Sequence, residues 1–141
     1  MKIYLDNGAF APTRGHPLDA GLDLKTPYSF TIWPGERKDV DTGVHVKLPI
    51  DTAAFVTGKS GLMRDKGIFC PPGTIDASYR GSIHAILINV SRSPCDFEVG
   101  DKIAQLVVVP CRIVDVEEVQ QVTDLGETDR GQSGFGSTGK K

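Results

Sequence analysis

Three short stretches of the sequence contain residue types that could bind or cleave a phosphate ester. The stretch RGQSGFGSTGKK (130–141) has Gly134, Gly139 and Lys140 in the spacing of a G-x-x-x-x-G-K phosphate loop. Such a loop follows a strand, continues with Ser or Thr and opens a helix, so that its backbone N–H groups surround the phosphates. Here Lys141 follows, and no strand is expected before the stretch. A phosphate loop of this type is therefore not expected.

The stretch KSGLMRDKG (59–67) is expected to form one short helix of about two turns. Ser60 is placed as its N-cap and Gly67 as the residue just past its C-terminus. A helix N-terminus has free backbone N–H groups and a partial positive charge, so this end, with Lys59 beside it, is suited to an anion. An ordinary short capped helix explains the same residues. This stretch alone leaves both interpretations open.

The stretch PPGTIDASYRG (71–81) places an acid at the tip of an expected tight hairpin. Asp76 follows the strand-like GTI and precedes Tyr79 and Arg80. A carboxylate at a hairpin tip can present a general base to a water molecule. Aspartate is equally a common turn residue, while Tyr79 and Arg80 taken singly fit rim packing and a surface charge. The residues themselves leave a catalytic base and a solvated turn open.

Length and charge exclude several classes of protein. A chain of 141 residues fits one domain and can bury a sizeable core without disulfides or metals. A net charge of -2 gives no basic field, so bulk nucleic-acid binding is not expected. The N-terminus has no apolar signal-peptide region, and no apolar run approaches the ~20 residues of a membrane span. The sequence predicts a cytoplasmic protein with neither a nucleic-acid nor a membrane partner.

The spacing of cysteine and histidine argues against disulfides and zinc. The cysteines are odd in number and form no C-x-x-C pair, which favours reduced thiols in the cytoplasm. The histidines lie far apart in the sequence, so a zinc site is not expected. These residues are Cys70, Cys95 and Cys111, and His16, His45 and His84.

The elements that would position these stretches are mostly strands. Apolar residues alternate or run continuously in several segments, which are separated by turn signals such as DNG, WPGE, PPG and VGD. Two almost continuously apolar segments, 82–90 and 103–110, are expected to be buried on both faces. Many short strands at close spacing predict an all-β fold, either a sandwich or a closed jelly-roll barrel. The predicted strands are 44–48, 53–57, 73–75, 82–90, 103–110 and 112–119.

The composition changes near Gly126, where the strand pattern ends and a Gly/Ser/Thr-rich stretch begins. No internal repeat or linker is found before that point. The sequence therefore predicts a β-barrel domain over residues 1–125 and a flexible C-terminal arm over residues 126–141.

Five stretches, taken in order, resemble the motifs of the homotrimeric dUTP diphosphatase (dUTPase) family. The resemblance runs from about residue 20 to residue 139, and the third and fifth motifs are highly specific. The matching stretches are AGLDL (20–24), KSGLMRDKGI (59–68), GTIDASYRG (73–81), GDKIAQL (100–106) and RGQSGFGSTG (130–139).

The resemblance implies a fold, an assembly and a reaction. The fold would be a jelly-roll-like β-barrel of the dUTPase type, in a homotrimer with three active sites at its subunit interfaces. The reaction would be hydrolysis of dUTP to dUMP and pyrophosphate, with Mg²⁺ on the triphosphate. It would keep uracil out of DNA and supply dUMP for dTMP synthesis.

The resemblance also implies a role for each part of the third motif. The hairpin would receive uracil and read its edge with backbone groups, near His84. Tyr79 would pack under the deoxyribose and leave no room for a 2′-hydroxyl. Asp76 would deprotonate the water that attacks the α-phosphorus. The backbone groups that read the base would come from Gly73, Thr74, Ile75 and Asp76.

The other motifs would hold the metal, the triphosphate and the far side of the base. Asp23 would hold a water in the Mg²⁺ shell. Lys59 stands where the family usually has Arg, so the charge is kept but the planar fork of a guanidinium is lost. Phe135 would stack on uracil when the arm closes over bound substrate. The further substrate-binding residues would be Ser60, Gly61, Gln105, Arg130, Gly136, Ser137 and Thr138.

Two alternative functions use the same expected fold. A dCTP deaminase would need a glutamate in the strand after the third motif, and residues 77–95 contain no Asp or Glu. A nucleotide-gated regulatory protein would not need a catalytic acid, although such a role could coexist with catalysis. The resemblance favours the diphosphatase because Asp76 and the fifth motif are both present.

Overall fold

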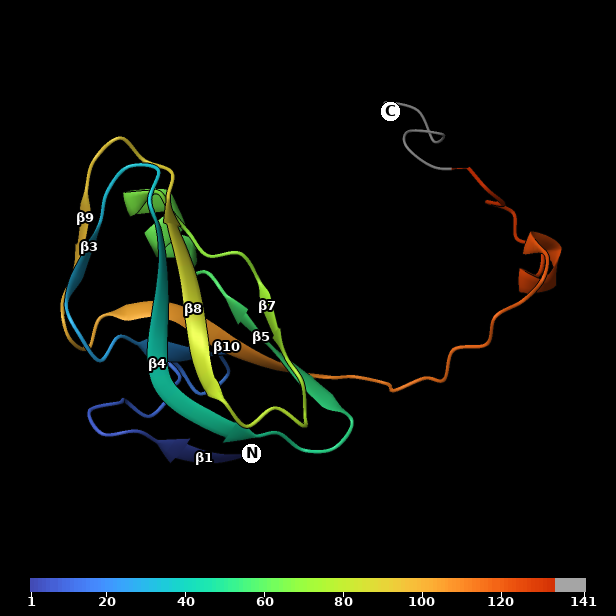
Figure 1. Ribbon diagram of the computed structural model, residues 1–141, viewed down its shortest axis with the longest axis horizontal. Coiled ribbons are helices and arrows are strands. Elements are labelled where there is room, and N and C mark those ends of the chain that lie inside the picture. The colour runs from blue at the N-terminus through green and yellow to red at the C-terminus, as the bar shows by residue number, and fades with distance from the viewer. Residues whose placement is uncertain (134–141) are drawn as a thin grey trace.

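The computed structural model describes residues 1–133, which are mostly β-strand and connecting loop (Figure 1). Two short helical turns, η1 (Leu62–Lys66) and η2 (Val122–Leu125), accompany the strands. The strands are β1 (Lys2–Leu5), β2 (Gly21–Lys25), β3 (Phe30–Ile32), β4 (Arg37–Lys47), β5 (Thr52–Thr57), β6 (Ile68–Phe69), β7 (Gly73–Ile75), β8 (Ser82–Asn89), β9 (Cys95–Phe97) and β10 (Lys102–Pro110).

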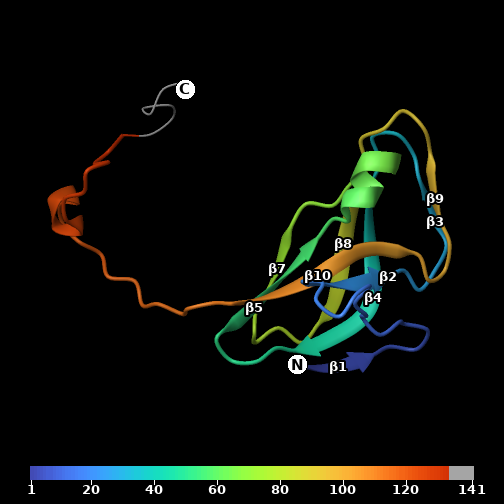
Figure 2. The ribbon, with the colours of Figure 1, turned by 180° about the vertical axis from the view of Figure 1, so that it is seen from behind.

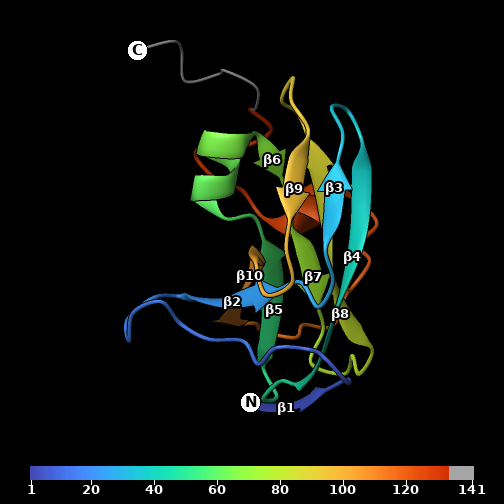
Figure 3. The same cartoon turned by 90° about the vertical axis from the view of Figure 1, so that its left-hand side faces the viewer.

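The strands form two four-stranded sheets and one two-stranded ribbon. The first sheet has the order β1-β4-β8-β6, the second has the order β2-β10-β5-β7, and β3 pairs with β9. Every named pairing is antiparallel. Figure 3 shows β4 and β8 on one side of the molecule and β2, β5 and β10 on the other. The chain has the jelly-roll-like all-β fold that the sequence predicted.

The hydrophobic core is built from both sheets. Leu24 of β2 and Leu106 of β10 are completely buried, and so are Val40 of β4 and Leu87 of β8. Burying one such side chain contributes about 1.5–3 kcal/mol. This core holds the two sheets, and with them the loops at the strand ends, in one arrangement.

Strand β8 has one buried face, whereas the sequence predicted two. Ile83, Ala85 and Leu87 are buried, but the alternate residues His84 and Ile86 are exposed. The prediction was wrong for the single chain because no second layer of residues 1–133 covers the outer face. Similarly, only part of β10 is fully buried, and its last four residues are half-buried or exposed.

The segment 112–119 was predicted as a strand but pairs with nothing in residues 1–133. After Pro110 the chain leaves the two sheets and runs outward (Figures 1 and 2). Both edges of β10 are already taken, by β2 and by β5, and the segment continues beyond them. Ile113, Val114 and Val116 are consequently exposed.

The predicted helix covers residues 60–66: Ser60 and Gly61 are α-helical, and the π-helical turn η1 follows them directly. Gly67 ends it at φ 65°, and its N–H bonds to carbonyls of the turn, as the sequence predicted. A Cβ at Gly67 would also lie 2.7 Å from the Cβ of Ser91, so both the backbone angle and the packing favour glycine here. The prediction of Ser60 as the N-cap was wrong: Ser60 already lies within the helix, Gly61 before η1 has helical backbone angles, and no side chain caps η1.

The three cysteines are free thiols, as predicted. Burial raises the pKa of Cys70, which favours the unreactive thiol form. Within residues 1–133, no helix has both the length and the apolar character that a membrane crossing requires.

Asn89, at the end of β8, is a completely buried polar residue that joins three segments. Its side-chain amide donates to the carbonyls of Ile32 and Ser93, each at 2.8 Å. Its side-chain oxygen accepts from the Ser91 N–H at 2.9 Å and from the Ser91 hydroxyl at 2.7 Å. All the hydrogen-bonding capacity of the side chain is used, so it fixes the β8–β9 loop against β3.

Replacing Asn89 by Ala should lower the free energy of unfolding by about 2–4 kcal/mol, because several buried donors and acceptors lose their partners together. Urea unfolding at a fixed protein concentration measures the change. The matched control is Asn7→Ala, at an exposed turn position, which should leave the midpoint nearly unchanged. Equal midpoints for the two variants would contradict this account of Asn89.

Candidate active site

A cavity of about 330 Å³ opens where β7 turns into β8. The sequence singled out all of its lining residues except Ser82, which was predicted only as the first residue of a strand. The cavity is large enough for a flat heterocycle. One wall is β7, whose outer backbone edge has no sheet partner among the described residues. The lining residues are Thr74, Ile75, Asp76, Tyr79, Ser82 and His84.

The hairpin that carries Asp76 is held by its own hydrogen bonds. The Tyr79 N–H donates to the Asp76 carbonyl at 3.0 Å, and the Tyr79 hydroxyl donates to the Ser82 carbonyl at 2.8 Å. The Arg80 guanidinium donates to the Ala77 and Tyr79 carbonyls at 2.7 and 2.6 Å. Arg80 therefore braces the turn, a role that its sequence position alone did not indicate.

Tyr79 packs against the glycine that follows the turn. A Cβ at Gly81 would lie only 2.3 Å from the Tyr79 hydroxyl oxygen, so the ring needs glycine beneath it. Tyr79 is 41% exposed and forms part of the cavity wall. Asp76 is exposed at the same rim, and none of the ion pairs within residues 1–133 involves it. Its carboxylate is available to water and to a ligand in the cavity.

A polar network orients His84 on the outer face of β8. His84 Nδ1 lies 2.9 Å from an Asp39 carboxylate oxygen, and Nε2 lies 3.7 Å from Asp41. The Ser82 hydroxyl donates to the Asp41 carboxylate. Burial would raise the pKa of Asp41, but hydrogen bonds from Ser82 and from the Gly43 N–H outweigh it and lower that pKa. Ser82 and His84, which line the cavity, are thus held from behind by the carboxylates of Asp39 and Asp41.

A second cluster surrounds Asp23 of β2. The Lys59 ammonium contacts one oxygen of the Asp23 carboxylate, and the Lys102 ammonium lies 2.7 Å from the other. Asp23 is buried, which would raise its pKa, but the two ammonium groups outweigh burial and lower it. Sequence reasoning missed Lys102, although its place at the start of the strand that pairs with β2 was a usable signal.

Gln105 of β10 lies in the same cluster. It stands opposite Asp23 on one side and Thr57 on the other. Its side-chain amide donates to the Gly58 carbonyl at 3.0 Å. A Cβ at Gly21 would lie 2.2 Å from its amide oxygen, so glycine at that position makes room for the side chain. The cluster brings together the predicted residues Asp23, Lys59 and Gln105, and Ser60 and Gly61 follow directly in the chain.

The Asp23 cluster fits a metal only as an outer partner. No group of three or more His, Cys, Asp or Glu side chains within residues 1–133 could hold a metal ion. Both oxygens of Asp23 already contact an ammonium group. Mg²⁺ usually keeps several waters and takes one or two carboxylates together with substrate phosphates. Contact between Asp23 and such an ion through a water molecule is compatible with this arrangement.

The two clusters lie at opposite ends of one strand. Asp76 directly follows Ile75, which pairs with Ala54 near the start of β5, whereas Lys59 lies beyond the other end of β5. Five residues of extended chain separate Ala54 from Lys59, which is roughly 16 Å. A single chain therefore does not bring the Asp76 cavity and the Asp23 cluster into one site.

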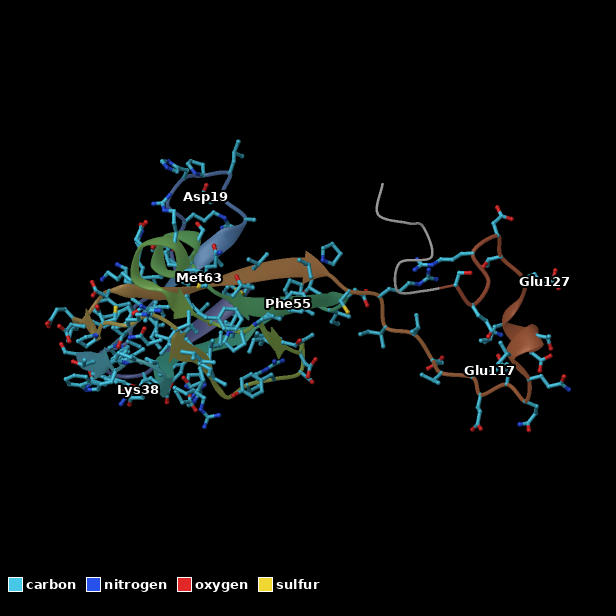
Figure 4. All side chains as sticks on the ribbon, turned by 90° about the horizontal axis from the view of Figure 1, so that it is seen from above. Asp19, Lys38, Phe55, Met63, Glu117 and Glu127 are labelled. Atoms are coloured by element: carbon cyan, nitrogen blue, oxygen red, sulfur yellow. The ribbon has the colours of Figure 1, made fainter. Side chains whose placement is uncertain are left out.

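The described part of the predicted arm lies away from both clusters. Figure 4 shows Glu117 and Glu127 on the outward segment, far from Phe55 and Met63 on the body. Arg130 is exposed there, and its guanidinium donates to the Ser133 carbonyl at 3.0 Å. Four predicted site residues, Phe135, Gly136, Ser137 and Thr138, lie outside the described residues.

The family to which the chain belongs follows from its match to known proteins. The sequence profile of dUTPase matches residues 8–139. The chain belongs to the dUTPase family. The deoxyuridine 5'-triphosphate nucleotidohydrolase of Corynebacterium jeikeium is 48% identical over 140 residues, which cover 97% of this chain and 90% of that protein. The enzyme of the same name from Clostridium novyi is 46% identical over 144 residues, which cover 99% of each.

Solved dUTPase structures share the fold. The dUTPase of Staphylococcus bacteriophage 80alpha, solved with dUpNHpp, is 25% identical, with a TM-score of 0.90 over 98% of this chain and 97% of that one. A mutant dUTPase of phage phi11 of S. aureus, described with a structural Mg(II) ion, is 24% identical, with a TM-score of 0.79 over 86% of this chain and 97% of that one. The likeness to the first of these extends over nearly the whole dUTPase chain.

Replacing Asp23 by Asn should lower the free energy of unfolding by about 1–3 kcal/mol, because two ammonium groups lose their shared carboxylate. The lysines are partly exposed, so the loss falls short of that of a fully buried pair. The pKa of Asp23 is lowered, so its stabilisation is complete above its ordinary value of 3.8 and is lost as pH falls through the lower folded value. Urea unfolding at pH 7 and pH 3 tests this, with the exposed Asp115→Asn as the control. If the wild type exceeded Asp23→Asn in free energy of unfolding by the same amount at pH 3 as at pH 7, the stabilising role of the Asp23 carboxylate would be contradicted.

Proposed function

We propose that this chain hydrolyses dUTP to dUMP and pyrophosphate. The observation that carries the proposal is the cavity at the β7–β8 turn with Asp76 on its rim, in a chain of the dUTPase family. The relatives from C. jeikeium and C. novyi are named as enzymes of this reaction. The 80alpha dUTPase was solved with dUpNHpp.

Asp76 is the general base of the reaction. Its exposed carboxylate takes a proton from a water molecule, and the water oxygen forms a bond to the α-phosphorus. The bond from that phosphorus to the pyrophosphate oxygen breaks in line with the attack. The backbone of Gly73–Ile75 and of Asp76 reads the edge of uracil near His84, and Tyr79 leaves no room for a 2′-hydroxyl.

The Asp23 cluster holds the triphosphate. Lys59, Gln105, Ser60 and Gly61 supply donors and a positive charge. Lys59 exchanges its contact with Asp23 for a phosphate oxygen when the triphosphate arrives, and Lys102 keeps Asp23 paired. When bound, Mg²⁺ supplies positive charge to the triphosphate oxygens. Asp23 would hold that ion through a water molecule.

The complete site is formed in a homotrimer. The separation of Asp76 from Lys59 in one chain supports this, because catalysis needs the base and the phosphate donors at one substrate. The exposed Ile86 on the outer face of β8 and the unpaired segment 112–119 supply apolar surface that an assembly can bury. The arm, residues 126–141, reaches a site on other subunits and closes it with Arg130, Phe135, Gly136, Ser137 and Thr138.

The reaction removes a DNA precursor that carries the wrong base. Hydrolysis of dUTP keeps uracil out of DNA, and the product dUMP is the precursor of dTMP. The free cysteines support a reducing compartment such as the cytoplasm.

Product analysis tests the activity. With Mg²⁺, the chain should release pyrophosphate from dUTP, only traces from dCTP, dTTP or UTP, and no ammonia. Asp76→Asn should bind dUTP with near-normal affinity while kcat falls by a factor on the order of 10² or more, as loss of a general base gives. Asp115→Asn, far from the cavity, serves as the control. Ammonia from dCTP would overturn the assignment, and equal loss of binding and turnover would make Asp76 a positioning residue instead.

Complementation tests the shared site. Asp76→Asn subunits lack the base, and subunits truncated after Asp129 lack the closing arm, so either pool alone should be nearly inactive. Refolded together, hybrid trimers should recover activity because some sites combine an intact Asp76 with an intact arm. Subunits with different tags must co-purify, which controls for failed mixing. Verified hybrids that stay as inactive as the parents would show that base and arm act within one chain.

A further inference from the structure

His45 of β4 touches the hairpin that carries Asp76, although it belongs to neither cluster. Its Nδ1 lies 2.8 Å from the Arg80 carbonyl, and its Nε2 lies 3.1 Å from the Asp6 carboxylate. It thereby connects the turn beyond β1 with the loop between β7 and β8. The inner hydrogen bonds of the hairpin join only its own residues, so His45 ties the hairpin to another part of the fold.

A bulge in β4 aims His45 at the hairpin. Asp41 pairs with His84 and His45 pairs with Ser82, so three residues of β4 stand opposite Ile83 alone. Gly43, within the bulge, has φ 65°, and its carbonyl accepts from the Asp6 N–H at 2.9 Å. Bulges next to functional sites commonly redirect a side chain. This one places Asp6 and Arg80 on opposite sides of the same imidazole ring.

Both contacts of His45 need a proton. Each ring nitrogen faces an oxygen that can only accept, a carbonyl on one side and a carboxylate on the other. A neutral imidazole has one N–H, so it would leave a lone pair pointing at one of these oxygens. Only the imidazolium donates to both.

We propose that His45, held as an imidazolium between Asp6 and the Arg80 carbonyl, is a positioning residue for the hairpin that carries Asp76. It acts on the reaction through the backbone of Arg80, which lies three residues after Ala77, where the turn begins. The kinetic part of this inference rests on the proposed function, whereas the structural part does not.

The charges around His45 favour the protonated ring. The hydrogen bond to the Arg80 carbonyl, then that to Asp6, raise the pKa of His45 above its ordinary value of 6.5. The contact is therefore complete below pH 6.5 and is lost as pH rises through the higher folded value. The charged and titratable groups that face or neighbour the ring are Lys2 and Tyr4 of β1, Asp6 of the following turn, Asp41 and Lys47 of β4, and Arg80 of the hairpin.

Hydrogen exchange tests the positioning without any need for catalysis. The protection factor of the Tyr79 N–H, relative to that of Leu87 in the core, should fall by a factor on the order of 10 between pH 5.5 and pH 8.5 in the wild type. His45→Gln should give low protection at both pH values. In Asp6→Asn the fall in Tyr79 protection should occur at lower pH. One acceptor of the imidazolium is then neutral, so the proton on His45 is held less strongly. His16→Gln, at an exposed histidine outside the hairpin, should behave as the wild type.

Kinetics supplies the second readout. The ratio of wild-type to His45→Gln kcat on dUTP should be largest near pH 5.5 and approach one near pH 8.5. Protection that does not depend on pH in the wild type, or the same pH dependence in His45→Gln, would overturn the proposal. If no dUTP is hydrolysed at all, the proposed function fails, but the exchange results still decide the role of His45.

Discussion

The pairing of β5 on both of its edges is the constraint on which the functional geometry depends. One edge binds β10, which carries Gln105 and lies against Asp23, and the other binds β7, which leads into Asp76. Because both pairings are antiparallel and in fixed register, Asp76 and the Asp23 cluster are kept apart at opposite ends of β5. A slip of one residue in either pairing would turn the side chains to the opposite face and dismantle one of the two clusters.

The parts of the site that could be predicted from the sequence are those made by neighbouring residues. Gly67 was predicted at the end of the helical turn because its requirement for a positive φ is local. The cavity at the β7–β8 turn draws most of its lining from one continuous stretch, so its residues could be named together. The resemblance to the dUTPase family added the Asp23 cluster, whose members lie in three separate motifs.

The parts that could not be predicted depend on long-range register or on surface left uncovered. The contact of Lys102 with Asp23 arises only because β10 pairs with β2, and the contact of His45 with Arg80 needs the bulge in β4. Apolar runs indicated buried strands, but they did not show that the covering layer of β8 is absent from the described part of the chain. In the same way, the alternation in 112–119 indicates a strand without identifying its partner.

The position of the unpaired segment 112–119 in the chain has a consequence for biosynthesis. An exposed apolar strand is a template for unwanted pairing with other chains. This segment follows every strand of the two sheets, so during synthesis β1–β9 leave the ribosome well before it and β10 directly before it. The exposed apolar segment thus emerges after all the strands of the two sheets, and the interval in which it can meet a wrong partner during synthesis is short.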